Sequence, residues 1–393
     1  MASLKRQREE FQGGRWVKRR ALCRNLLASL PQDLGGYVVS FLTTREAART
    51  RVCNKAFSTR DDLKYTSQAG RIRTVKQWNA FCASVSPAAI RIVSGSVRRL
   101  QLDATASRWP DALVALRGTD TFDQPIVALP ASLTTLHMGD DFNQPIDGLP
   151  ARLISLELGR GFNRPIGVLP AGLESLAFGY RFNHPIDVLP ASLKSLILSV
   201  DFDQPIEVLP ASLTSLAMGT HFNQPLHPGV LPAGVKSLFL SSYFNQPLHA
   251  GVFQAGLGTL VFGAFFNQPL HAGVLPASLM SLVSGASFNE PLGVGVLPAS
   301  LMSLFFGASF NEPLGVGVLP VSLRSLKFGE YFNQPLEPGV LPASLSSLVF
   351  GASFNKPLGV GVLPGSLRSL KLGNGYNQPI GVGVLPASLR SAF

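Results

Sequence analysis

The sequence predicts a mainly β solenoid, in which short coils of 20–22 residues stack along one axis. The first observation is the phrase Phe-Asn-Gln-Pro-(Ile/Leu), which recurs in thirteen copies, some of them variant, from residue 122 onward. The second is its spacing, which is 20 residues up to Phe222 and 22 residues from Phe222 to Tyr376. The third is the pattern of Leu213–Met218, where apolar side chains recur as in a strand buried on one face.

Most of the positive charge precedes the repeats. The net charge is +11 over 393 residues, yet residues 1–120 carry 22 Lys and Arg against 9 Asp and Glu, and the remainder carries 12 against 14. A phosphate backbone needs a basic stripe, so this distribution argues against nucleic acid as a partner of the repeats. No stretch of about 20 apolar residues is free of Pro, Asn and charge, so we expect no membrane span.

Residues 1–25 are predicted to form a disordered basic tail. The basic clusters at residues 5–6 and 18–20 resemble a bipartite nuclear-import signal, although a solvated basic arm explains them equally well. The three cysteines, at positions 23, 53 and 82, form neither a disulfide framework nor a zinc pattern. This is typical of a reducing, intracellular compartment, and both the cytoplasm and the nucleus stay open.

Residues 26–60 are predicted to form two helices. Apolar residues recur on one helix face between Leu34 and Leu42, and Thr43 with Glu46 forms a capping box for a second helix. The order Leu-Pro-x-Asp-Leu, Val-Val-Ser-Phe-Leu and Val-Cys-Asn-Lys-Ala-Phe resembles an F-box over about 28 positions. The side chains that carry this resemblance are Leu30, Pro31, Leu34, Val38, Phe41, Leu42, Val52 and Phe57.

Residues 61–96 are predicted to form a helical connector, with one apolar face made of Val75, Trp78, Phe81, Cys82 and Val85. Residues 97–121 are expected to be degenerate repeats that cap the array. Residues 97–102 imitate a repeat strand, and Trp-Pro-Asp-Ala-Leu at 109–113 stands where later copies read Leu-Pro-Ala-Ser-Leu.

Residues 122–393 are predicted to be the repeat array itself. In one coil, Gly219 should permit a sharp turn off the strand, and Phe222 and Leu226 should fill the core of the returning side. Pro210 and Pro225 cannot donate to a hydrogen-bond ladder, so the returning side should be irregular rather than helical.

The array resembles FNIP repeats, a relative of leucine-rich repeats found in amoebae, some other protists and large DNA viruses. The resemblance covers residues 109–393 and implies a leucine-rich-repeat-like, curved array. The Asn of each phrase falls later than the ladder Asn of ordinary leucine-rich repeats. It fits either an amide ladder between neighbouring backbones or local turn chemistry.

The strand positions that flank the second Leu are the candidate binding surface. One row is Ser or Thr throughout, whereas the other varies, and the varying residues that we assign to target binding are Glu157, Phe239, Val261, Val283, Phe305, Lys327 and Lys371. The central part of this row is apolar, which suits a protein partner better than nucleic acid. Drift after duplication, or a face that buries itself, would explain the row as well.

No catalytic, metal or cofactor site is expected. His227, His249 and His271 share one register, but no carboxylate or Cys joins them, and surface histidines are the simpler reading. The two resemblances together imply a substrate-recognition subunit of a cullin–RING ubiquitin ligase, which docks a Skp-family adaptor and holds an unidentified target protein. The alternative is a non-catalytic interaction scaffold whose helices only cap the solenoid. A third class is a nucleic-acid-associated protein that uses the basic N-terminal part.

Overall fold

The computed structural model describes residues 72–84, 97, 99–106, 108–126, 128–186 and 188–392. The chain divides into two compact units, Met1–Asp62 and Leu63–Phe393, and every described residue belongs to the second. The first described element of that unit is the helix α4 (Val75–Ser84), and fifteen strands follow it. Leu63–Phe393 is therefore a β unit with very little helix among its described residues, as the sequence predicts.

The strands are short and evenly spaced along the chain. They are β1 (Arg99–Leu102), β2 (Ala115–Gly118), β3 (Thr135–His137), β4 (Ser155–Glu157), β5 (Ser175–Ala177), β6 (Ser195–Ile197), β7 (Ser215–Ala217), β8 (Ser237–Phe239), β9 (Thr259–Val261), β10 (Ser281–Val283), β11 (Ser303–Phe305), β12 (Ser325–Lys327), β13 (Ser347–Val349), β14 (Ser369–Lys371) and β15 (Ser391–Ala392).

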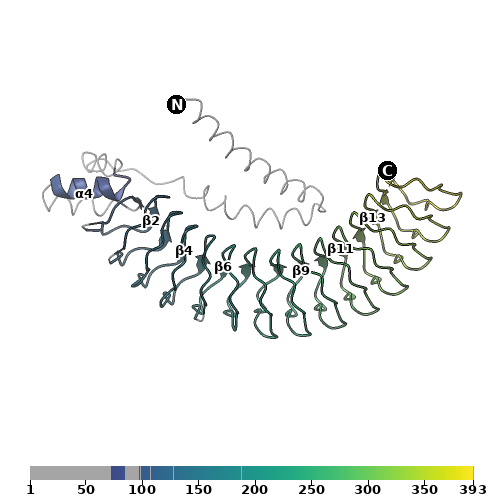
Figure 1. The fold of residues 1–393 in the computed structure, drawn as a ribbon, viewed down its shortest axis with the longest axis horizontal. Coiled ribbons are helices and arrows are strands. Elements are labelled where there is room, and N and C mark those ends of the chain that lie inside the picture. Colours follow the sequence, from purple (N-terminus) through teal and green to yellow (C-terminus); the bar gives the residue numbers. More distant parts are fainter. Residues whose placement is uncertain are drawn as a thin grey trace, which may run out of the picture. The chain divides into compact units, whose positions relative to one another are not determined.

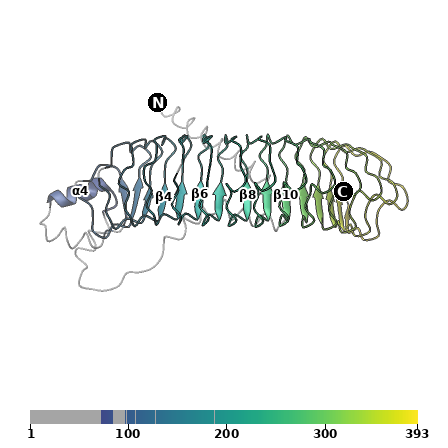
Figure 2. The ribbon, with the colours of Figure 1, turned by 90° about the horizontal axis from the view of Figure 1, so that it is seen from below.

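All fifteen strands form one parallel sheet whose spatial order is the order of the sequence. Equivalent residues pair across the sheet, so Leu282 of β10 lies between Leu260 and Leu304 of its two neighbours. Within this unit the strands line the inner side of a curve, and the irregular returning segments lie outside them (Figure 1 and Figure 2). The predicted curved solenoid is confirmed.

The strands from β3 to β14 are three residues long because each coil turns immediately before its strand and after it. Ahead of the strand, the N–H of Leu213 donates to the carbonyl of Pro210 at 3.0 Å, and the N–H of Leu323 donates to Pro320 at the same distance. This turn places two leucines, such as Leu213 and Leu216, inside the coil, where both are fully buried. The Leu-x-x-Leu spacing therefore encodes a turn followed by a strand.

A column of stacked phenylalanines fills the returning side. The column members are Phe122, Phe142, Phe162, Phe182, Phe202, Phe222, Phe244, Phe266, Phe288, Phe310, Phe332 and Phe354. Neighbouring rings stack with centroids 6.1–6.3 Å apart, and Tyr376 continues the column 5.9 Å from Phe354. Because each ring of the column stacks on the rings of adjacent coils, every coil completes its core with its neighbours.

The Asn after each Phe forms a ladder between coils. Its Oδ1 accepts a hydrogen bond from the backbone N–H of the equivalent residue in the next coil, at 2.7–3.1 Å. Asp123 and Asp203 occupy the same position in two coils and accept in the same way. Of the two sequence interpretations, the ladder is confirmed. At Asp123, the hydrogen bonds from the Asn143 backbone and the Gln144 side chain hold the carboxyl pKa below its usual value.

The ladder and the phenylalanine column explain the curvature. On the strand side, backbone groups bond each other directly, and parallel strands lie about 4.8 Å apart. On the returning side, Asn side chains bridge the coils and the rings are spaced by more than 6 Å. Because the coils are farther apart on the returning side, the strand side becomes the concave one.

The glycine that follows most strands was expected to permit a sharp turn, but the structure gives it a different role. These glycines, Gly219 among them, are not in the positive-φ region, so the predicted reason of a sharp turn is wrong. A Cβ added at Gly329 would lie 1.7 Å from the carbonyl oxygen of Gly307. The glycine therefore allows the backbones of adjacent coils to approach. Ser199 and Ser241 occupy this position in two coils, and their hydroxyls donate to the carbonyls of Phe182 and Thr220.

The two extra residues of the longer coils form a tight turn on the returning side. In one such coil the N–H of Val318 donates to the carbonyl of Gly315 at 3.3 Å, and Gly317 between them has φ of 82°. A positive φ at the third residue of a four-residue turn is typical of type II, which favours Gly there. Equivalent glycines with φ of 81–90° recur in all eight longer coils, from Gly229 to Gly383.

Gly317→Ala should lower the free energy of unfolding by about 1 kcal/mol, because an L residue is strained at positive φ. Gly315→Ala is the matched control, since its Cβ would meet only the Val318 side chain at 3.8 Å. We expect that control to be neutral or slightly stabilising. Equal effects of the two substitutions in urea unfolding would contradict a turn that depends on the φ of Gly317.

The helix α4 closes the N-terminal edge of the sheet. The N–H of Gln101 in β1 donates to the carbonyl of Arg73 at 2.8 Å, and Thr74 forms a parallel bridge with Gln101. Val75 and Trp78 are fully buried against the first coils, and the indole of Trp78 donates to the carbonyl of Arg108. The predicted apolar helix face therefore covers β1, although Val85 lies outside the described residues.

Candidate protein-binding face

The outward side chains of the strands form a continuous surface that we call the strand face. Three residues of each coil contribute to it, namely the residue before the strand and the first and third strand residues. The middle strand residue points inward, as Leu216 and Leu326 do, and both are fully buried. Because the register is kept from coil to coil, each outward position forms a row across the sheet.

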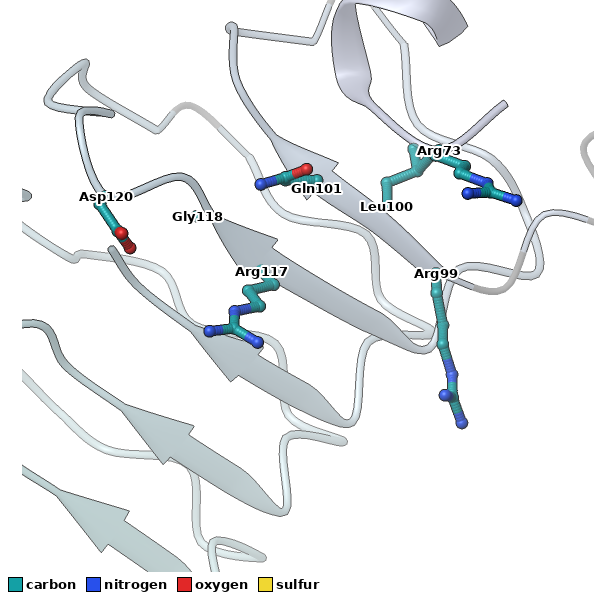
Figure 3. Close-up of a pocket in the computed structure, with 7 residues that line it drawn as sticks. All are labelled: Arg73, Arg99, Leu100, Gln101, Arg117, Gly118 and Asp120. Atoms are coloured by element: carbon teal, nitrogen blue, oxygen red, sulfur yellow. The ribbon is translucent and has the colours of Figure 1, made fainter. Parts of the chain in front are cut away.

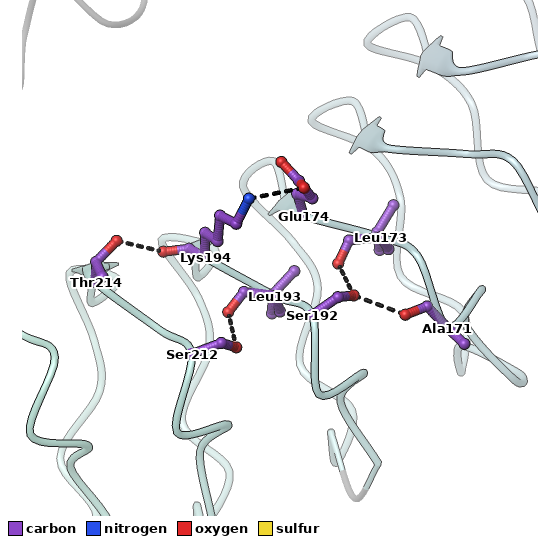
Figure 4. A network of polar contacts seen from close by, with 8 residues as sticks. All are labelled: Ala171, Leu173, Glu174, Ser192, Leu193, Lys194, Ser212 and Thr214. Atoms are coloured by element: carbon purple, nitrogen blue, oxygen red, sulfur yellow. Dashed lines mark hydrogen bonds and ion pairs between the residues drawn. The ribbon is translucent and has the colours of Figure 1, made fainter.

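Opposite charges pair between neighbouring coils on the strand face from β3 to β6. Nδ1 of His137 lies 2.6 Å from a carboxylate oxygen of Glu157, and the Lys194 ammonium lies 2.7 Å from the Glu174 carboxylate. The latter pair bridges the strand face in Figure 4. Glu157, assigned to target binding from the sequence, is therefore engaged with a neighbour in its own chain.

Serines beside the strand face bind backbone carbonyls and hold the coils in register. The hydroxyl of Ser192 donates to the carbonyl of Leu173, and that of Ser212 donates to the carbonyl of Leu193 (Figure 4). The same bond recurs in most longer coils, as from Ser322 to Leu301 at 2.7 Å. The repeated Ser before the first Leu is therefore structural, and it does not report on binding.

The strand face is mainly apolar from β8 to β11, where Lys236, which precedes β8, is the one charged outward residue that the structure describes. Phe239, Val261 and Val283 are half-buried in one row, as the sequence analysis expected of a partly exposed apolar stripe. Phe305 belongs to the same row but is only 6% exposed, so it supports the surface from beneath. Two residues that the sequence analysis did not single out enlarge the patch, because Met280 is 48% and Met302 is 37% exposed.

The strand face is basic from β12 to β15. Lys327 is half-buried between Phe305 and Val349 of the neighbouring strands, and Lys371 is exposed two coils farther on. Burial, followed by the positive charge of Lys371, lowers the pKa of Lys327. Three arginines that stand one residue before their strands add to this segment: Arg324, Arg368 and Arg390.

A shallow cavity lies at the N-terminal end of the strand face. Its volume is about 500 Å³, and its lining consists of Arg73, Arg99, Leu100, Gln101, Arg117, Gly118 and Asp120 (Figure 3). Gln101 and Arg117 lie in the varying row, and they extend it by two coils ahead of His137. The signal was present in the sequence, but the coil of β1 lacks the repeated phrase and the coil of β2 carries it only in the variant form Phe-Asp-Gln-Pro.

Other predicted residues fall outside the site or outside the described part of the chain. All eight adaptor-binding candidates, from Leu30 to Phe57, precede residue 72 and are not described. His227, His249 and His271 are exposed in successive turns, and within the described ranges no group of three His, Cys, Asp or Glu could hold a metal ion. Among the described residues, no helix is long and apolar enough to cross a membrane.

Several solved structures are similar to this one. CroV588, whose crystal structure is described as a novel circular LRR protein structure, is 39% identical with a TM-score of 0.73. The match covers 77% of this chain and 47% of CroV588, so the chain spans about half the length of that protein. YopM from Yersinia enterocolitica WA-314 is 19% identical with a TM-score of 0.44, over 75% of this chain and 72% of YopM. No curated protein matches the chain.

The FNIP Repeat family model matches the chain eight times. The matched segments are 122–161, 142–181, 162–199, 182–221, 222–264, 266–309, 310–353 and 354–391. They overlap along the first coils and together cover most of the chain, from the first Phe of the column to β15. Their boundaries follow the phenylalanine column and the Asn ladder, which are the features that define the fold here. The chain belongs to the FNIP repeat family.

Proposed function

We propose that this chain is a protein-binding receptor whose strand face holds a target protein. The observation that carries the proposal is the apolar patch of β8–β11, made of Phe239, Val261, Met280, Val283 and Met302. Contiguous exposed apolar surface is costly in water and is typical of protein interaction sites. The patch lies on a surface where the side chains differ between otherwise similar coils.

We further propose that the N-terminal segment recruits a Skp-family adaptor, which would make the chain the substrate receptor of a cullin–RING ubiquitin ligase. Support comes from the F-box-like order of apolar residues between Leu30 and Phe57. The position of α4 adds to it, because this helix already covers β1. The alternative role for residues 26–60 is to cap the solenoid, and α4 already covers the N-terminal strand of the array.

Target binding can be tested by affinity purification with the full chain and a strand-face variant. Val261→Glu should lose partners that the natural chain retains, because it places an unpaired charge in the apolar patch. Val294→Glu is the matched control, since Val294 is 71% exposed on the returning side. Both variants should unfold like the natural chain. An identical partner set for the natural chain and Val261→Glu would contradict binding at this patch.

Adaptor recruitment can be tested with a purified Skp-family adaptor and the full chain. Pro31→Ala combined with Leu34→Asp should abolish binding, because F-box helices dock through apolar packing. Circular dichroism of the repeat unit should not change. Leu4→Asp is the control, since it alters the basic tail alone. If the natural chain does not bind the adaptor, the ligase role fails, and target binding by the strand face stands by itself.

A further inference from the structure

We infer that the strand face from β8 to β15 binds an extended acidic segment of a partner protein, with apolar residues over β8–β11 and carboxylates or phosphates over β12–β15. The inference rests on the proposed function and specifies the chemistry of its target. Two observations carry it, namely the cluster of basic side chains on β12–β15 and its continuity with the apolar patch.

The basic cluster contains Arg324, Lys327, Arg368, Lys371 and Arg390. The other described outward positions of these coils are Ser or Val, so no acidic residue faces the cluster from the described strands. Within the described residues, none of the five side chains forms an ion pair. Five cations on four adjacent coils therefore lack a counter-charge from the part of the chain that the structure describes.

The first half of the same face shows that its geometry permits pairing. Between β3 and β6, His137 meets Glu157 and Glu174 meets Lys194 across adjacent coils. Carboxylates at equivalent outward positions are thus tolerated by the fold and reach cations on the next coil. On β12–β15 the charged residues at these positions are all cations, and the neutralising charge must come from outside the strand face.

Lys327 joins the two halves of the surface. It lies in register with Phe305 on one side and Val349 on the other, so its ammonium emerges beside apolar side chains. Burial and Lys371 both disfavour its charged form, which is why its pKa is lowered. A carboxylate bound between the two lysines would remove the repulsion and satisfy both ammonium groups.

The dimensions fit one extended segment. Strands about 4.8 Å apart place β8 and β15 roughly 34 Å from each other, which an extended chain crosses with about ten residues. Nucleic acid fits this surface less well, because its phosphates are evenly spaced and would leave the apolar half uncovered. The repeats are also slightly acidic as a whole, since residues 121–393 carry 12 Lys and Arg against 14 Asp and Glu.

A displayed library of random peptides of about twelve residues, selected on the full chain, tests the inference. The selected peptides should carry Asp or Glu next to apolar residues, and their binding should weaken as salt is raised. Lys327→Glu combined with Lys371→Glu should reduce the affinity of a selected, labelled peptide about tenfold or more.

The matched control is Arg181→Asp combined with Lys356→Glu, which changes the net charge equally on other surfaces. Both acidic residues occur naturally at equivalent positions of other coils. Asp201 occupies the position of Arg181 in the next coil, and Glu312 occupies the position of Lys356 two coils earlier. We expect peptide affinity to stay within about twofold and both double variants to unfold like the natural chain.

The outcomes separate the inference from the proposed function. If the selected peptides are apolar but not acidic, and the Lys327 and Lys371 reversal leaves their affinity unchanged, the acidic preference is overturned while the binding face stands. If no peptide is enriched, the inference fails together with peptide binding by the proposed face. If a single-stranded oligonucleotide displaces the acidic peptide and binds more tightly than it, the partner class is wrong.

Discussion

Phe266→Ala should lower the free energy of unfolding by about 3–5 kcal/mol, the cost of removing a large buried aromatic side chain. Phe266 is fully buried, with its ring centroid 6.2 Å from those of Phe244 and Phe288 and 4.1 Å from that of Phe262. The substitution breaks the column in both directions. Urea unfolding, monitored by far-ultraviolet circular dichroism, would measure the change in the free energy of unfolding.

Its control is the adjacent residue. Phe265 is 50% exposed and contacts Tyr243 at the surface, with ring centroids 4.8 Å apart. Phe265→Ala should cost less than about 1 kcal/mol, because little buried area is lost. Similar losses from both substitutions would contradict a core built on the stacked column.

The same measurement reports on how the array divides. Where the period changes from 20 to 22 residues, β7 and β8 share only the pair Ala217 and Phe239, whereas most other strands pair over three residues. The stability of a solenoid is approximately the sum of the stabilities of its coils and the interaction energies between neighbouring coils. Unfolding therefore divides into separate transitions first at the weakest interface between coils. In Phe266→Ala, we expect the coils before β8 to unfold in a separate transition. A single transition would contradict a weak interface at this point.

Asn311→Ala should lower the free energy of unfolding by about 1–3 kcal/mol, because it leaves a partly buried donor without a partner. The Oδ1 of Asn311 accepts a hydrogen bond from the N–H of Asn333 at 2.8 Å. The chain suggests the rescuing variant. Asp203 occupies the same ladder position and accepts from the N–H of Asn223 at 2.8 Å.

Asn311→Asp should therefore recover most of the lost stability at neutral pH, since it restores an oxygen at the same place. The comparison separates the hydrogen bond from packing, because Asp and Asn have nearly the same shape. Thermal unfolding of the three proteins is sufficient to decide. If Asn311→Asp is as unstable as Asn311→Ala, the acceptor in the ladder is not what holds these coils together.

The repeating part of the fold could be predicted because it depends on local patterns repeated many times. The Leu-x-x-Leu spacing, the Phe column and the Asn ladder each recur in successive coils, so a single register explains them all. The reason for the glycine after the strand could not be read from one coil, because the atom that a Cβ would meet belongs to the next coil. For Gly329 that atom is the carbonyl oxygen of Gly307.

The composition of the proposed binding face was predicted only in part. The varying row identified Val261 and Lys327, but the residue before each strand was overlooked because it lies outside the alternating pattern. Met280, Met302 and Arg324 were missed for this reason. Counting charges over the whole array also hid the basic cluster, since the acidic residues of the repeats lie elsewhere. A surface that forms across coils becomes visible only when the coils are stacked.

The order of the strands bears on how the protein is made. The strands β1 to β15 pair strictly in sequence order. When a strand leaves the ribosome, the strand before it, which is its first pairing partner, has therefore already been synthesised. Protein domains generally fold as they emerge, at about 5–20 residues per second. The helix α4, which precedes β1 and covers it, can offer a finished edge before the first repeat leaves the exit tunnel. Each new coil of 22 residues would then be synthesised within a few seconds, and it would pack onto the coil that is already folded.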